Sequence, residues 1–193
     1  MGVYIMLRIA GIDYSLTSPA VCVFVGGSIF KYEDCQFFYL TDIKKYAKSF
    51  TKNIHGKMFA EYNAESERYC TIADWAVTKV VGCEQVAIED YAYSRGNVGR
   101  VFHIAENTGI LKYKIWKTGT PIDVFSPTAI KKYATGKGNS KKDAMHESFK
   151  EDTGTDLMCT MGMDNTRSPL NDIVDAYFIC KYMHSQMTVD TTS

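Results

Sequence analysis

Short apolar segments that end in a turn or an acidic residue constrain the fold of this chain more than any other feature. Segments of this length, rich in Val, Ile and aromatic residues, are typical of buried β-strands. The predicted strands are Leu7–Asp13, Pro19–Val25, Ser28–Tyr32, Gln85–Ile88 and Ile122–Phe125. Because Gly26-Gly27 supplies a tight turn, we expect the first three strands to form an antiparallel meander.

Apolar residues at helical spacing occupy the stretches between and after these strands. The predicted helices are Asn63–Val81, Val98–Trp116, Ser126–Tyr133, Lys141–Glu151 and Leu170–Met183. Residues 33–62 predict no firm structure, residues 136–140 and 152–168 are expected to be loops, and the polar tail from about residue 185 is expected to be flexible. This order predicts one α/β domain over residues 1–193, with a mixed central sheet flanked by helices on both faces.

Four carboxylates lie where predicted apolar elements begin or end. Asp13 ends LRIAGID and Glu89 ends QVAIE, and the carboxyl edge of a buried sheet is where α/β proteins place their sites. Asp172 and Asp175 start the last helix three residues apart, which puts them on one face. Mg²⁺ takes oxygen ligands, and two such ions roughly 4 Å apart can promote phosphodiester hydrolysis. The pattern therefore predicts a site for divalent cations.

Each of these acids also has a purely structural interpretation. Asp13 can shape a turn, and Glu89 can be a surface acid at a strand end. Asp172 can interact favourably with the helix macrodipole, and Asp175 can be solvated. Taken singly, these interpretations are at least as good as catalysis. The joint occurrence of four acids on these elements favours the cation site.

Charge is distributed unevenly along the chain, although 22 basic and 22 acidic residues cancel overall. Ten basic residues fall between Arg95 and Lys142, where Glu106 and Asp123 are the only acids, so this segment carries +8 and the rest −8. Such a cationic region can bind a polyanion despite the neutral sum. A lysine-rich solvated surface explains the same pattern equally well.

Several motifs together resemble the RuvC family of Holliday junction resolvases, from Leu7 to about His184. That family combines a GID opening, an AIE strand end, a lysine-bearing loop and a final D-x-x-D-A helix. The matching segments here are Gly11–Val21, Val86–Tyr93, Thr128–Lys142 and Asn171–Cys180. No single motif is decisive, but their order and spacing are specific.

The resemblance implies a ribonuclease H-like fold and a homodimer that cuts four-way DNA junctions with Mg²⁺ or Mn²⁺, two ions per site. The implied catalytic residues and metal ligands are Asp13, Glu89, Asp172 and Asp175. Lys131 and Lys142 best match the family's phosphate-contacting lysines, with Lys132 and Lys141 as alternatives shifted by one residue. The full set of expected DNA-binding residues is Lys131, Lys132, Lys137, Lys141, Lys142, Arg95, Arg100, Tyr91 and Tyr93.

The chain also departs from the family pattern. Tyr14-Ser15 follows the first Asp, where bacterial members usually have Pro-Gly. Ala92 stands at the position nearest the family's aromatic wedge, between Tyr91 and Tyr93. Either tyrosine could stack on an unpaired base, an interaction worth about 1–3 kcal/mol, or belong to the core. These departures suggest a divergent member of the family, with a viral source as one interpretation.

Three alternative functions fit part of the sequence. Actin-like ATPases and sugar kinases share the GID opening, but they need a second copy of the fold that this chain lacks. A non-catalytic nucleic-acid-binding module would explain the basic segment but not the four acids. Within the nucleases, a ribonuclease H or a flap-type endonuclease competes with the resolvase interpretation.

Further expectations concern the surroundings of the protein. Six singly scattered cysteines without a CxxC pair indicate reduced thiols and no structural zinc. No apolar run approaches the ~20 residues that span a bilayer, and the start lacks secretory-signal features. We therefore expect an intracellular, cytoplasmic protein without a membrane partner, in the host cytoplasm if it is viral.

The helix predicted over residues 98–116 is the expected dimer interface. This expectation rests on its apolar residues Val101, Ile104, Ile110 and Ile115.

Overall fold

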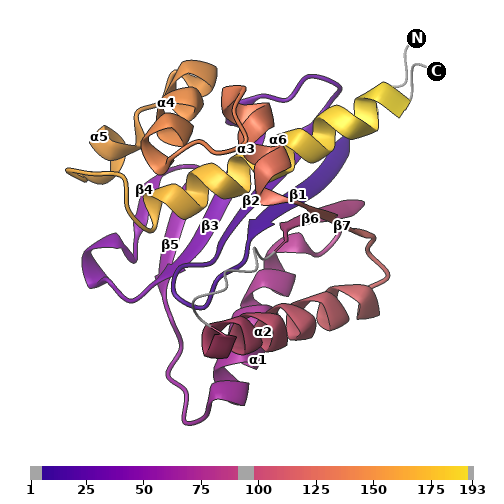
Figure 1. The fold of residues 1–193 in the computed structure, drawn as a ribbon, viewed down its shortest axis with the longest axis vertical. Coiled ribbons are helices and arrows are strands. Elements are labelled where there is room, and N and C mark those ends of the chain that lie inside the picture. Colours follow the sequence, from indigo (N-terminus) through magenta and orange to yellow (C-terminus); the bar gives the residue numbers. More distant parts are fainter. Residues whose placement is uncertain (1–5, 91–97, 191–193) are drawn as a thin grey trace.

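The computed structural model describes residues 6–90 and 98–190, in which helices cover both faces of one mixed sheet (Figure 1). The strands are β1 (Leu7–Asp13), β2 (Ala20–Gly26), β3 (Cys35–Thr41), β4 (Ser49–Thr51), β5 (Ile54–Met58), β6 (Gln85–Glu89) and β7 (Ile122–Phe125). The helices are α1 (Glu65–Val80), α2 (Val98–Lys117), α3 (Pro127–Thr135), α4 (Lys142–Thr153), α5 (Leu157–Met161) and α6 (Leu170–Asp190). Two 3₁₀ helices, η1 (Tyr32–Asp34) and η2 (Lys44–Tyr46), flank β3.

Strand direction decides which residues meet at each edge of the sheet, whose order is β4-β5-β3-β2-β1-β6-β7. β1 is parallel to β6, and β6 is parallel to β7. Two successive antiparallel pairings, β1 with β2 and β2 with β3, make β3 run in the direction of β1, and β5 is parallel to β3. Five strands therefore end at one edge, which we call the carboxylate edge because β1 ends there at Asp13 and β6 at Glu89.

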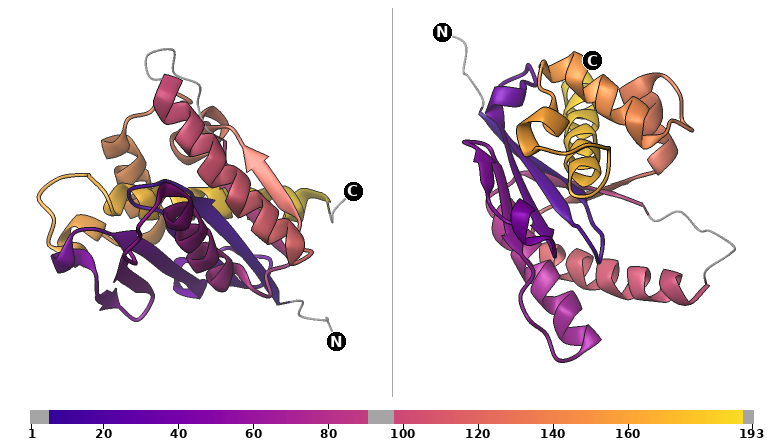
Figure 2. Two further views of the ribbon diagram at one scale, coloured as in Figure 1. Left: turned by 90° about the horizontal axis from the view of Figure 1, so that it is seen from below. Right: turned by 90° about the vertical axis from the view of Figure 1, so that its left-hand side faces the viewer.

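The two faces of the sheet support separate apolar cores. Ile9 of β1 packs with Ile173 and other residues of α6, whereas Ile12 packs with Ala73 of α1 and Leu111 of α2. Figure 2 shows α6 on one side of the sheet and the α1–α2 pair on the other. Because successive side chains of a strand point to opposite faces of the sheet, the odd-numbered residues of β1 face α6 and the even-numbered ones face α1 and α2.

Gly11 sets how closely α6 approaches β1. A Cβ on Gly11 would collide with the backbone nitrogen of Cys180 and lie 2.6 Å from the carbonyl oxygen of Ala176. Because these are backbone atoms of a helix, they cannot rotate away. The absence of a side chain at position 11 is therefore what lets α6 lie directly against β1.

The predicted third strand at residues 28–32 is wrong. The chain after β2 bends instead, and the Phe30 ring stacks on Phe24 with centroids 4.5 Å apart. The third strand is β3, which is antiparallel to β2, so the meander itself is confirmed. Residues 33–62, for which no structure was predicted, form η1, β3, η2, β4 and β5. Packing of the partly buried Phe30 against Phe24 requires a longer connection than the tight turn that Gly26-Gly27 suggested.

Two segments that were not predicted to be helical also contain helix. Within the expected 152–168 loop, Leu157–Met161 forms α5, because the Asp156 carboxylate accepts from the backbone N–H of Cys159 at 3.1 Å and caps the helix. The tail expected to be flexible from residue 185 is helical to Asp190. His184 explains this extension, since it is buried, contacts the carbonyl of Gly27 at 3.1 Å and packs on the Phe24 ring.

Helix α2 was predicted almost to the residue, and it turns two of its four expected interface residues inward, while Val101 and Ile104 are partly exposed. Ile115 is fully buried, and Ile110 packs against the core. Among the described side chains of α2, the large apolar ones that are most exposed are Phe102, Tyr113 and Trp116. Across the described residues, no helix combines the length and the apolarity that a bilayer crossing requires.

Candidate active site

The site begins with two neighbouring strand ends. Ile12 of β1 is paired with Ile88 of the parallel strand β6, so Asp13 and Glu89 follow side by side at the carboxylate edge. Asp13 lies two residues after Gly11, and Glu89 lies two residues after Ala87. Because side chains alternate along a strand and both Gly11 and Ala87 face α6, the two acids face α6 as well. The strand register therefore directs both carboxylates toward the beginning of α6.

Helix α6 supplies the other two carboxylates. Asp172 and Asp175 lie in its first two turns and are 8% and 5% exposed. The charges of both, and that of Glu89, act on Asp13, so the four acids predicted from the sequence are gathered at one place. The contact at Gly11 is what permits this, because it holds the first turns of α6 against the end of β1.

Burial and mutual repulsion disfavour ionisation within this group. Burial raises the pKa of Asp13 well above its usual range, and the charges of Asp172, Asp175 and Glu89 raise it further. Burial, followed by the charge of Asp175, raises the pKa of Glu89 to about 7, although Lys142 and Lys131 oppose the shift. Burial also raises the pKa of Asp172. Crowded carboxylates of this kind are stabilised by a cation.

The residues present suit a divalent cation. Oδ2 of Asp172 is buried and has no hydrogen-bond partner among the described residues, so it is available as a ligand. Hard oxygen donors are what Mg²⁺ and Mn²⁺ prefer. In the described parts of the chain, however, no group of three or more acidic, His or Cys side chains is already arranged as a metal site. The Lys142 ammonium, ion-paired with Asp175, provides the positive charge instead.

A cavity of about 330 Å³ opens over the carboxylates. Lys131 of α3 and Lys142 of α4 line it together with Asp13, Glu89 and Asp175. The cavity therefore places two cations beside the acids, an arrangement suited to a negatively charged group such as a phosphate.

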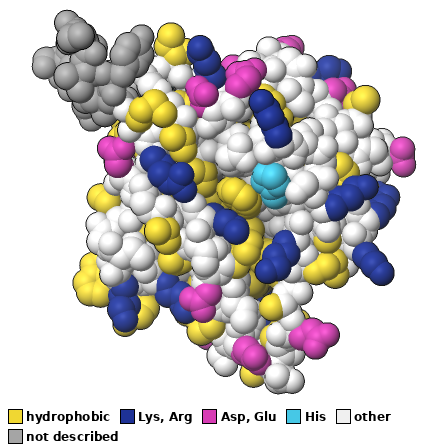
Figure 3. Space-filling view, turned by 180° about the vertical axis from the view of Figure 1, so that it is seen from behind, with side chains coloured by type: hydrophobic (Ala, Val, Ile, Leu, Met, Phe, Trp, Pro, Cys, Tyr) yellow, Lys and Arg dark blue, Asp and Glu magenta, His cyan; other side chains and the backbone are white. Residues whose placement is uncertain are grey.

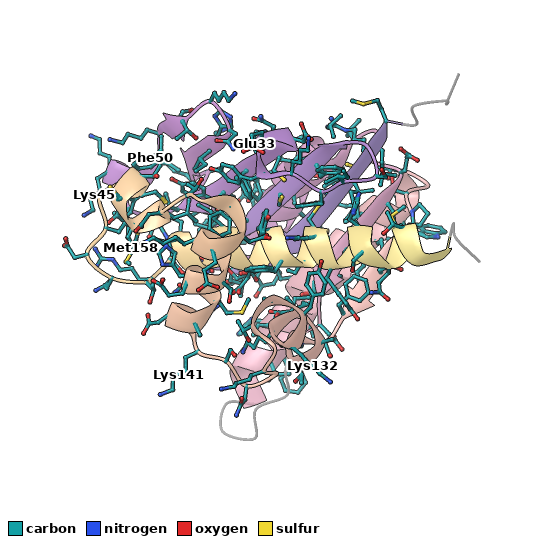
Figure 4. The ribbon with its side chains drawn as sticks, turned by 90° about the horizontal axis from the view of Figure 1, so that it is seen from above. Glu33, Lys45, Phe50, Lys132, Lys141 and Met158 are labelled. Atoms are coloured by element: carbon teal, nitrogen blue, oxygen red, sulfur yellow. The ribbon has the colours of Figure 1, made fainter. Side chains whose placement is uncertain are left out.

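The other predicted DNA-binding residues are placed differently. Lys132, Lys137 and Lys141 are exposed and do not line the cavity, and Figure 4 shows Lys132 and Lys141 extending away from the sheet. Tyr91, Tyr93 and Arg95 lie outside the described residues, as does the side chain of Arg100. Their proposed roles in DNA binding stay predictions.

Sequence reasoning missed the contribution of α2 to the site. The Tyr14 hydroxyl donates to Oδ1 of Asn107 at 3.1 Å, which ties the residue after Asp13 to α2. Asn107 and Thr108 are buried, and Thr108 lines the cavity with Ile104. No pattern in the sequence distinguishes these polar residues from the exposed ones of the same helix, because only the packing of α2 turns them inward.

Comparisons with known proteins agree with this architecture. No protein-family model matches the chain, and no curated protein matches it in sequence. Among solved structures, Thermus thermophilus RuvC is similar with a TM-score of 0.60 at 16% identity, covering 94% of this chain and 98% of that one. The same protein in complex with a Holliday junction substrate gives a TM-score of 0.63 at 16% identity, covering 94% and 97%.

A third similar structure is the yeast mitochondrial Holliday junction resolvase Ydc2, with a TM-score of 0.57 at 13% identity, covering 98% of this chain and 83% of that one. These similarities, with the mixed sheet flanked by helices, confirm the predicted ribonuclease H-like fold.

Proposed function

We propose that this protein is a divalent-metal-dependent endonuclease that hydrolyses phosphodiester bonds in branched DNA, with four-way junctions as its main substrate. The observation that carries the proposal is the gathering of Asp13, Glu89, Asp172 and Asp175 at one place. The first two and Asp175 line a cavity together with Lys131 and Lys142. The choice of branched DNA is supported by the fold shared with RuvC, which has been seen with a Holliday junction substrate.

The four carboxylates would hold Mg²⁺ or Mn²⁺, two ions in the proposed arrangement. Ions bound there would supply an activated water and neutralise charge that develops on the phosphate. The protein contributes the arrangement itself, because Asp13 and Glu89 come from adjacent strands and Asp172 and Asp175 from a helix held against them. No ligand of the set would sit on a loop, so the site is preorganised.

Lys131 and Lys142 would contact the phosphate on either side of the bond that is cut. Lys142 is half-exposed, and its ammonium reaches over Asp175 into the cavity. Lys131 lowers the pKa of Glu89 through its charge, so its ammonium also lies within range of the acids. Two flexible ammonium groups at a cavity rim can follow a phosphate without fixing the base sequence.

Symmetric cutting of a four-way junction requires two active sites, and we propose a homodimer. Its interface would use the exposed aromatic face of α2, formed by Phe102, Tyr113 and Trp116, which are 63%, 57% and 70% exposed. Large apolar side chains exposed together on one helix are typical of an interaction surface.

One comparison tests the proposed function. The purified protein is incubated with Mg²⁺ and four substrates: a four-way junction, a flap, an RNA–DNA hybrid and a linear duplex. We expect paired cuts in the junction, with at least a roughly thousand-fold loss of cleavage in Asp13→Asn and Glu89→Gln and nearly unchanged junction binding. Cleavage of the hybrid alone or of the flap alone would show that it, rather than the four-way junction, is the substrate. Full activity in both variants would overturn the metal assignment.

A further inference from the structure

A second group of basic residues lies on and around β4 and β5, away from Lys131 and Lys142. Residues 42–57 contain five lysines and a single acid, Asp42, so this stretch carries +4. Figure 3 shows a group of Lys and Arg side chains on the side of the molecule where Figure 1 places β4 and β5. The active site as described makes no use of these charges.

Strand direction places part of this group beside the active site. β3 runs parallel to β1, so it ends at the carboxylate edge, and η2 with Lys44 and Lys45 follows it there. β4 is antiparallel to β5 and therefore starts at this edge, directly after Lys48. Lys52, in the turn between β4 and β5, lies at the opposite end of the hairpin.

The fold holds η2 firmly against the sheet. Tyr46 is 1% exposed, and its carbonyl oxygen accepts the Tyr39 hydroxyl at 2.6 Å. Gly56 of β5 has no side chain, which leaves room for the backbone of Tyr46. The hydroxyl of Tyr46 also accepts from Nη2 of Arg167 at 3.4 Å. Because Arg167 precedes Asp172 by only five residues, η2 is joined to the segment that leads into Asp172 and Asp175.

Aromatic rings orient two of the lysines. The ammonium nitrogen of Lys45 lies 4.6 Å from the centre of the Tyr46 ring, and that of Lys48 lies 5.0 Å from the centre of the Phe50 ring. Such cation–π contacts fix a side chain without neutralising its charge. Figure 4 shows Lys45 and Lys141 on opposite sides of the beginning of α6.

These cations have no acidic partner within the described residues. The ion pairs there involve other lysines, such as Lys150 with Asp156 and Lys181 with Asp152, and none includes Lys44, Lys45, Lys48 or Arg167. Like charges held close together on rigid elements repel one another, and a bound polyanion would neutralise this repulsion. We call these four residues the η2 cluster.

We propose that the η2 cluster binds the phosphate backbone of a DNA arm that leaves the active site across β3 and β5. This proposal rests on the proposed function and adds a second anchoring surface to it. η2 lies over β5, three strands from β1, so it is displaced by about 14 Å across the sheet from the strand that ends at Asp13. At 3.4 Å per base pair, that distance corresponds to phosphates roughly four base pairs from the cut.

Two matched double variants test the proposal. Lys44→Gln/Lys45→Gln removes two charges from the cluster while keeping most of each alkyl stem. Lys31→Gln/Lys52→Gln removes two exposed charges from the opposite edge of the sheet. Affinity for a four-way junction with arms of about 15 base pairs is measured over a range of salt concentrations without divalent cation, and thermal unfolding checks that both variants fold.

We expect the Lys44/Lys45 variant to bind roughly ten- to fifty-fold more weakly near 0.1 M salt, with a salt slope lower by about 2, and the Lys31/Lys52 variant to bind nearly as the wild type. Uncharged methylphosphonates three to six positions from the cut should weaken wild-type binding and have little further effect on the Lys44/Lys45 variant. Equal losses in both variants, or none, would overturn the proposal.

Cleavage by the wild type is scored separately. If the wild type cuts no substrate with Mg²⁺ while the selective loss of binding is observed, the proposed function fails and the η2 cluster still stands as a nucleic-acid surface. If the wild type cuts junctions and the two double variants bind the junction equally well, the proposed function is supported and the proposed role of the η2 cluster in DNA binding is refuted.

Discussion

The ammonium nitrogen of Lys142, at the first residue of α4, is ion-paired with Oδ2 of Asp175, in the second turn of α6. Burial acts to lower the pKa of Lys142, but the carboxylates of Asp175, Asp13 and Asp172 outweigh it and raise the pKa. The lysine therefore carries its charge throughout the pH range in which the acids ionise. The ion pair joins α4 to α6 through two residues that are 33 positions apart in the sequence.

Replacing Lys142 by Gln should destabilise the metal-free protein, because Asp175 then lies buried and unpaired among other acids. We expect a loss of about 1–3 kcal/mol in the free energy of unfolding, less than for a fully buried pair because Lys142 is half-exposed. Denaturant unfolding measures it. Lys141→Gln, an exposed neighbour outside the cavity, is the control. Mg²⁺ should restore most of the loss, and equal stability of both variants would contradict the role of the ion pair.

The raised pKa of Glu89 predicts how the stability of the metal-free protein depends on pH. Its folded pKa of about 7 exceeds the ordinary value of 4.5, so the folded state binds more protons between these values. Stability should therefore fall as pH rises from about 4.5 to about 7, and the loss is complete above that range. Glu89→Gln removes this contribution and should be more stable than the wild type near pH 8, by about 2–3 kcal/mol at most.

Thermal unfolding with and without Mg²⁺ checks this prediction near pH 5 and pH 8. Mg²⁺ should stabilise the wild type mainly at the higher pH, since the ligands must be ionised, and should stabilise Glu89→Gln much less. Glu151→Gln, an exposed acid on α4, controls for the loss of one charge. A gain in stability of the metal-free wild type between pH 5 and pH 8 would contradict the raised pKa of Glu89 in the folded state.

Gly11→Ala should separate α6 from β1. The new Cβ meets the backbone of Cys180 and Ala176, so we expect a loss of about 2–3 kcal/mol in stability and weaker binding of Mg²⁺. Gly27→Ala is the matched control, because a Cβ there has nothing within 4 Å. Unfolding and a Mg²⁺ titration followed by thermal shift measure the two effects. If Gly11→Ala keeps wild-type stability and Mg²⁺ response, close packing of α6 is not what assembles the acids.

Trp116→Glu should prevent dimerisation by placing a charge in the exposed aromatic face of α2. We expect the wild type to sediment as a dimer at micromolar concentration and the variant as a monomer with an unchanged circular dichroism spectrum. Ile29→Glu, at an exposed apolar residue that is 69% accessible on another surface, should remain a dimer. A monomeric wild type would rule out the interface.

The sequence by itself determined the elements that carry the site. Asp13 and Glu89 were recognisable because each ends a short apolar strand, and Asp172 and Asp175 because their spacing puts them on one helix face. These signals are local, since strand alternation and helical periodicity depend on neighbouring residues in the chain. For the same reason the limits of α2 and β7 were predicted closely.

Tertiary structure alone decided what surrounds those acids. The third strand was misplaced because packing of Phe30 against Phe24, rather than the turn residues, set the length of the connection. The inward direction of Asn107 and Thr108 depends on how α2 packs. The pairing of Lys142 with Asp175 and the contact of η2 with Arg167, just before α6, both join residues far apart in sequence. Such contacts depend on how closely helices and strands pack, which at Gly11 rests on a missing side chain whose neighbours lie about 170 residues away.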